Sequence, residues 1–165
     1  MVSEIEFPKQ TKINGKEQTP YYRDSFRVTV NKANLEAKNV YHGIFGFLPK
    51  PVRLALIFRN CVVKYFGFAA SNSEMSLPLE DVKTGSKAGF LIIDSVEPLE
   101  VICGSYESNM DMWLSVLKLS EQEFTVSTLV NLKTKKGNAY MAFIKPFHKL
   151  VAKYCIKQAL RAGRI

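Results

Sequence analysis

The feature that most constrains this fold is a series of four short strand-like segments followed by one long helical segment. The two longest of the four alternate apolar and polar residues with a period of two, which is typical of strands with one buried face. Short loops separate them, so they predict an antiparallel meander. Residues 138–162 instead place apolar residues at three- and four-residue steps, which predicts a long helix that Pro146 bends. The four predicted strands are 90–94, 99–104, 110–119 and 124–133.

A further strand and a short helix are predicted ahead of the meander. Residues 24–30 alternate in the same way and predict another half-buried strand. We expect Asn31 or Asn34 to cap a short helix that runs towards Phe45, because an Asx side chain accepts hydrogen bonds from the first helical turn. Gly46 is expected to end that helix.

The most apolar stretch of the chain is residues 52–66. It is interrupted by polar residues and is shorter than the roughly 20 apolar residues that a membrane-spanning helix needs. We therefore predict a second helix that begins at Pro51 and buries most of its circumference. Arg53, Asn60 and Lys64 are expected to form its one polar stripe.

The order of these elements predicts an α+β helix-grip fold, in which a curved antiparallel sheet wraps around a long C-terminal helix. A chain of 165 residues is long enough for one domain with its own core. We assign residues 21–165 to a single helix-grip domain and residues 1–20 to an N-terminal extension. Residues 69–88 are polar and irregular, which predicts a surface loop. In such an architecture an apolar cavity is expected between sheet and helix.

Charge is unevenly distributed along the chain, whose formal net charge is +8. Residues 124–165 contain no acid, and five of their bases recur at every fourth position of the predicted helix. This stripe indicates either contact with phosphate groups or, as we favour, a solvated outer helix face. Nucleic acid is an unlikely partner, because Phe143 and Phe147 are expected to face the core rather than stack on bases. The stripe is Lys145, Lys149, Lys153, Lys157 and Arg161.

No catalytic or metal-binding motif is present. The two histidines, His42 and His148, lack metal-ligand spacing, and the three cysteines are too widely spaced for a metal or redox motif. The chain has no P-loop and no nucleophile elbow. We therefore predict no metal and no cofactor.

Asp111 and His148 are the two candidates for acid–base chemistry. Asp111 alternates with apolar neighbours on its strand, so it is expected on the face opposite Met110 and Met112. It is either a cavity group or, at least as plausibly, an outward surface acid. His148 follows Phe147 on the last helix, and a structural histidine is the favoured interpretation.

Several motifs resemble a mainly bacterial family of domains of unknown function, found alone or fused behind short-chain-dehydrogenase-like domains. The resemblance covers about residues 22–160 and is most specific in the final motif. It implies the START-like, pollen-allergen-like helix-grip superfamily (SRPBCC), many members of which bind lipids, sterols or polyketides, while a few are cyclases or hydrolases. The motifs are Tyr22–Phe26, Ile44–Arg53 with Leu56–Asn60, Gly85–Ile92, Met110–Val116, and Gly137 and Tyr140 with Lys145–Lys149.

We therefore expect a cytoplasmic binding module for a small apolar ligand, held between the sheet and the last helix. An enzyme of the cyclase, hydrolase or isomerase type, with His148 and Asp111 as an acid–base pair, is the first alternative. The second is an interaction module that uses the basic helix on a peripheral membrane surface or on a dehydrogenase-like partner. The candidate ligand-binding residues are Tyr41, His42, Asp111, Trp113, Tyr140, Phe143, Phe147 and His148.

Overall fold

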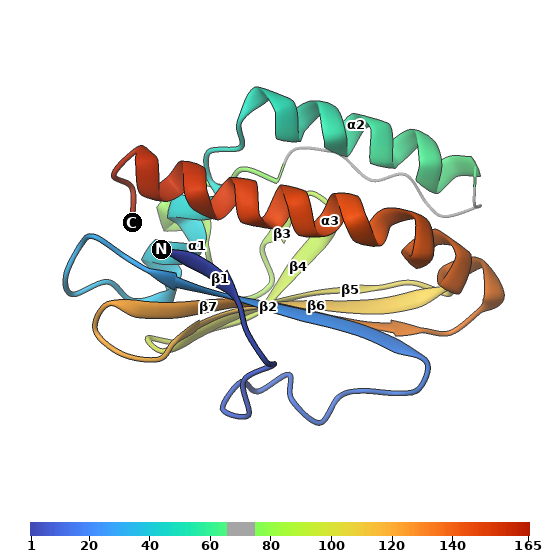
Figure 1. The fold of residues 1–165 in the computed structure, drawn as a ribbon, viewed down its shortest axis with the longest axis horizontal. Coiled ribbons are helices and arrows are strands. Elements are labelled where there is room, and N and C mark those ends of the chain that lie inside the picture. The colour runs from blue at the N-terminus through green and yellow to red at the C-terminus, as the bar shows by residue number, and fades with distance from the viewer. Residues whose placement is uncertain (66–74) are drawn as a thin grey trace.

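The computed structural model describes residues 1–65 and 75–165, and it has the predicted α+β architecture (Figure 1). One open, curved antiparallel sheet of seven strands has the order β1-β2-β7-β6-β5-β4-β3. Helices α2 and α3 lie together on one side of the sheet (Figure 1), which we call the inner face. The strands are β1 (Val2–Glu4), β2 (Tyr21–Thr29), β3 (Lys87–Ala88), β4 (Leu91–Val96), β5 (Glu100–Tyr106), β6 (Met110–Lys118) and β7 (Glu123–Leu132), and the helices are α1 (Ala37–Phe45), α2 (Lys50–Tyr65), the 3-10 turn η1 (Leu79–Asp81) and α3 (Lys135–Arg161).

The predicted meander is confirmed, since β4, β5, β6 and β7 pair in sequence order as antiparallel neighbours. Strand β2 then pairs with β7, so the first predicted strand lies beside the last. Alternation along β6 places Met110, Met112 and Leu114 on the inner face and Trp113 and Ser115 on the outer face. The register thus decides which side chains can meet the helices.

The long C-terminal helix is confirmed as α3, although its buried stripe differs from the predicted one. Thr134 caps it by accepting a hydrogen bond from the backbone N–H of Gly137 at 3.1 Å. The helix continues through Pro146 as one element of 27 residues. Its buried side chains, including Met141, Cys155 and Ile156, face the sheet and complete the core.

The predicted cap of α1 is wrong. The helix begins after Glu36, whose backbone N–H donates to the side chain of Asn39 at 3.0 Å. Asn34 has a positive φ of 57°, whereas an N-cap residue needs an extended backbone. The predicted end is confirmed, because the N–H of Gly46 bonds to the carbonyl of His42.

The prediction that α2 buries most of its circumference is also wrong. Only Val52 and Val63 are buried, while Leu54 is 66% exposed. Val52 belongs to the main core cluster, and Val63 belongs to a smaller cluster with Met110 and Val130 of the sheet and Met141 of α3. The predicted loop at 69–88 lies partly outside the described residues; its described part holds η1 and β3.

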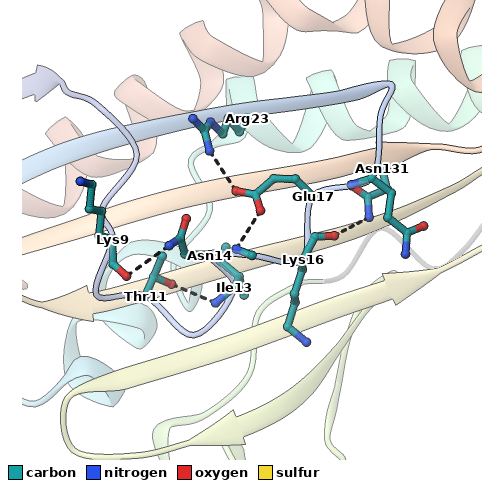
Figure 2. A network of polar contacts seen from close by, with 10 residues as sticks. Lys9, Thr11, Ile13, Asn14, Lys16, Glu17, Arg23 and Asn131 are labelled. Carbon is teal, nitrogen blue, oxygen red and sulfur yellow. Dashed lines mark hydrogen bonds and ion pairs between the residues drawn. The ribbon is translucent and has the colours of Figure 1, made fainter.

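The N-terminal segment, residues 1–20, begins with β1 at the edge of the sheet, and its later residues pass across the outer face, below the sheet in Figure 1. Strand β1 adds to the edge of β2, and Ile13 is fully buried against Trp113 and Leu129. Polar contacts hold the segment in place, as Figure 2 shows for Glu17 with Arg23 and for the carbonyl of Lys16 with Asn131. The N-terminal segment therefore covers the part of the outer face where Ile13 lies, whereas Tyr106 of β5 stays 55% exposed.

Candidate functional site

An apolar cavity of about 360 Å³ lies between the inner face of the sheet and helices α2 and α3. A second hollow of about 120 Å³ continues from it and shares several lining residues, among them Met112, Thr128 and His148. The walls are almost wholly apolar, and the larger hollow opens to solvent between the helices. Its lining is Ala55, Leu56, Phe58 and Arg59 of α2, Phe90, Met110 and Met112 of the meander, Thr128 and Val130 of β7, and Tyr140, Met141, Ile144, Phe147, His148, Leu150 and Val151 of α3.

The cavity exists because α2 stands away from the sheet. The side chains of β6 and β7 that face inward are apolar and of moderate size, so they do not fill the space beneath the two helices. Phe90 closes part of the wall, and the guanidinium of Arg59 lies 4.0 Å from the centre of its ring. This cation–π contact places one positive charge at the cavity wall.

The main polar group of the cavity is His148, which is held by two residues of β2. Its Nε2 lies 3.3 Å from Oδ2 of Asp24, whose side chain is 1% exposed. The hydroxyl of Tyr22 donates a hydrogen bond to the same carboxylate oxygen at 2.6 Å. Oδ1 of Asp24 and Nε2 of His148 are buried and make no regular hydrogen bond with the described residues.

The electrostatics of this group keep Asp24 ionised. Burial by itself raises the pKa of Asp24, but His148 and the Tyr22 hydroxyl together outweigh it, and the pKa stays below its ordinary value. Burial and the adjacent carboxylate raise the pKa of Tyr22, so its hydroxyl remains a donor. The arrangement is a carboxylate that orients an imidazole at the wall of an apolar cavity.

The structure brings together three of the predicted site residues, Tyr140, Phe147 and His148, at the cavity wall. Phe143 packs on Phe147, with ring centres 5.8 Å apart, but it is 44% exposed and does not line the cavity. The expectation that Phe143 and Phe147 face the core is therefore wrong, because the buried stripe of α3 passes through Met141 and Cys155 instead.

Tyr41 and His42 lie on α1, away from the cavity. Tyr41 is buried in the main core, and burial raises the pKa of its hydroxyl. His42 packs edge-on against Phe47, and burial lowers the pKa of its imidazole. Both side chains stabilise the end of the domain rather than the site.

Asp111 and Trp113 point to the outer face of β6, opposite the cavity. Asp111 pairs with Lys133 at 2.7 Å. The indole N–H of Trp113 donates to the hydroxyl of Tyr106 at 3.1 Å. The sheet separates Asp111 from His148, so these two do not form the acid–base pair that the sequence suggested.

The basic stripe of α3 is divided between two surroundings. Lys149 forms an ion pair with Glu4 of β1, and Lys153 lies 3.4 Å from the same carboxylate. Lys145 stands over the ring of Tyr22. Lys157 and Arg161 are exposed. The stripe therefore begins beside the edge of the sheet and ends on the solvent side of the helix.

Sequence reasoning missed Asp24, Tyr22, Thr128 and Arg59. The sequence did mark Tyr22 and Asp24 as buried positions, because they alternate with Phe26 along the strand and so share its buried face. A carboxylate at a buried strand position needs a partner, and that requirement points to an unassigned histidine or base. Arg59 gave no such signal, since a base on a helix is ordinarily solvated.

Neither a metal cluster nor a spanning helix occurs in the part of the chain that the structure describes. No three His, Cys, Asp or Glu side chains gather closely enough there to hold an ion. None of the helices described is long and apolar enough to cross a bilayer.

Comparison with known families gives one match. The model of the family described as Protein of unknown function (DUF2867) matches residues 17–155, which includes every strand of the sheet except β1 and most of α3. No curated protein and no solved structure matches the chain.

Proposed function

We propose a function from the geometry of the chain itself, because this chain belongs to DUF2867, a family whose description states no function. We propose that the chain binds a small apolar ligand in the cavity between the sheet and helices α2 and α3. The observation that carries this is the hollow of about 360 Å³ with apolar walls. Ligand pockets are typically about 300–1,000 Å³ and mostly apolar, with a few placed polar groups.

The polar groups at the wall indicate what one end of the ligand carries. His148, oriented by Asp24, offers a nitrogen for a hydrogen bond, and Thr128 adds a hydroxyl nearby. Arg59 supplies a positive charge on the α2 side. An apolar molecule with one hydroxyl, carbonyl or acid group fits this set better than a hydrocarbon, which would leave these groups unpaired.

The START-like, helix-grip relationship is part of the same proposal. Three features of the fold support this relationship. They are the open curved sheet, the long C-terminal helix that lies across the sheet, and the two helices that follow β2. The position of the cavity between sheet and last helix agrees with the way that architecture holds ligands.

The experiment is native mass spectrometry of the chain purified from its own host, followed by titration with the neutral fluorophore N-phenyl-1-naphthylamine. We expect a retained small molecule, or fluorophore binding, that Thr128→Phe removes by filling the cavity. Ser120→Phe adds the same ring on an exposed turn and is the control. Equal fluorophore binding by the wild type and Thr128→Phe would exclude this cavity, as would no binding at all.

The Asp24–His148 pair favours an enzyme as the second candidate. A buried carboxylate that orients a histidine prepares it to accept a proton from a bound molecule. With the retained molecule identified, incubation in D₂O would show deuterium incorporation at carbon by mass spectrometry. We expect His148→Gln to abolish the exchange and to retain binding. Absence of any exchange or product in the wild type would leave binding as the function.

A further inference from the structure

Helices α2 and α3 expose an unusual amount of apolar surface. Leu54 is 66% exposed, Leu150 is 69% exposed and Tyr65 is 89% exposed, although a helix on a monomer normally turns such residues inward. We call this set, together with the bases around it, the helical face. Its exposed apolar residues are Leu54, Ile57, Phe58 and Tyr65 of α2 and Phe143, Phe147, Leu150 and Tyr154 of α3.

The helical face also carries bases. Neither α2 nor α3 contains an Asp or a Glu in its own sequence. Some of the bases are held elsewhere, such as Lys149 on Glu4. Arg53, Lys64, Lys157 and Arg161 remain exposed at the margins of the apolar residues.

The mouth of the cavity lies within the same face. Phe58, Phe147 and Leu150 line the cavity and are also at least half exposed, so they form its rim. A surface that covered the helical face would therefore also cover the entrance.

We propose that the helical face docks on an anionic lipid bilayer. Apolar side chains flanked by Lys and Arg are what an interfacial helix presents to acyl chains and anionic headgroups. A protein partner would ordinarily meet a mixed charge rim. Single-stranded nucleic acid would stack on the exposed rings but would leave Leu54, Ile57 and Leu150 without an apolar partner. Docking does not need an occupied cavity, so it goes beyond ligand binding.

The native chain contains its own reporter for the test. Cys61 lies on α2 and is exposed, whereas the other two cysteines are buried. Burial raises the pKa of Cys103 to about 12 and that of Cys155 to about 11, which keeps both unreactive. An environment-sensitive fluorophore attached at Cys61 should shift to the blue with vesicles of phosphatidylcholine and phosphatidylglycerol at low ionic strength. Vesicles of phosphatidylcholine alone should bind at least tenfold more weakly.

Two pairs of variants locate the surface. The first is a double variant, Arg53→Glu with Lys157→Glu. It should weaken vesicle binding about 25-fold or more, because each base near an anionic surface raises the binding affinity about fivefold. Its control is the double variant Lys9→Glu with Lys83→Glu, which makes the same change in net charge outside both helices and should have little effect. Leu54→Ser with Leu150→Ser should weaken binding, while Leu99→Ser, at a leucine that is 60% exposed on another surface, should not.

Three results would overturn the proposal. One is no binding to anionic vesicles at low ionic strength. Another is an equal loss in the helical-face variants and their controls. The third is self-association in sedimentation that Leu54→Ser abolishes, which would assign this face to a second copy of the chain. Thr128→Phe should still bind vesicles, so failure of the cavity and failure of docking are distinguishable.

Discussion

The two faces of the sheet are built from the same strands but are closed in opposite ways. On the outer face, Ser25 and Ser127 are fully buried and their hydroxyls lie 2.8 Å apart. Glu100, 3% exposed, accepts hydrogen bonds from the hydroxyls of Thr11 and Ser115. On the inner face the walls are apolar, and a hollow remains beneath α2 and α3.

The difference shows where this chain has room for a ligand. Short polar side chains allow the N-terminal segment to approach the outer face closely. Most buried polar groups there are hydrogen-bonded, whereas the hydroxyl of Thr125 has no partner among the described residues. Helices α2 and α3 leave a hollow over the inner face, although Val52, Leu56 and Val63 of α2 pack against the core. The outer face is tightly packed, and the inner face keeps the hollow in which we propose that a ligand binds.

The largest test of this contrast uses two adjacent residues of β7. Ser127→Phe on the outer face should cost about 3–4 kcal/mol, because it overpacks the face and breaks the bond to Ser25. Thr128→Phe on the inner face should cost less than about 1 kcal/mol, since the ring enters the cavity. Urea unfolding measures both. Equal costs would mean that the inner face is as tightly packed as the outer one.

The second test compares two glutamates that bind neighbouring residues of the N-terminal segment. Glu100→Ala should cost about 3 kcal/mol, because it leaves the buried hydroxyls of Thr11 and Ser115 without their acceptor. Glu97→Ala removes an exposed ion pair with Lys12 and should cost less than about 0.5 kcal/mol. Thermal unfolding of the two variants separates them. Similar melting temperatures would show that the outer network adds little.

The third test addresses the buried carboxylate of Asp24 on the inner face by its pH dependence. The pKa of Asp24 in the folded chain lies below its ordinary value of 3.8. The stability that the carboxylate contributes is therefore complete above about pH 4 and is lost as pH falls through the folded pKa. Asp24→Asn should cost about 1–2 kcal/mol at neutral pH, and the difference from wild type should shrink in acid. A difference that stays constant with pH would refute this, and exposed Asp81→Asn is the control.

The smallest expected effect concerns the helical face. Ile57→Ser should change the free energy of unfolding by less than about 0.5 kcal/mol, because the side chain is 53% exposed. Chemical denaturation checks this. A loss of 2 kcal/mol or more would indicate that Ile57 is covered in solution, for example by a second copy of the chain.

Local sequence patterns predicted much of this fold. The period of two along residues 110–119 correctly placed Asp111 opposite Met110 and Met112. It could not say which face the helices cover, so Trp113 was wrongly grouped with the ligand-binding residues. Helical periodicity likewise shows which residues of α2 are apolar without showing what covers them.

The partner of His148 was beyond sequence reasoning for a topological reason. Asp24 meets it only because β2 crosses to pair with β7, and that pairing brings distant parts of the chain together. Alternation marked Asp24 as a buried position, but no local pattern identifies the side chain that faces it. The candidate site was therefore predicted in location and only partly in composition.

The two helices are held unequally by the rest of the fold. Helix α3 is fixed along the sheet edge by Glu4 and packs on α1, β1, β2 and β7, whereas Val52 and Val63 are the only buried residues that the structure describes in α2. Amide hydrogens of α2 should consequently exchange with solvent much faster than those of the buried stripe of α3. Exchange of a bound molecule would then be limited by the opening of α2, while the sheet and α3 remain rigid.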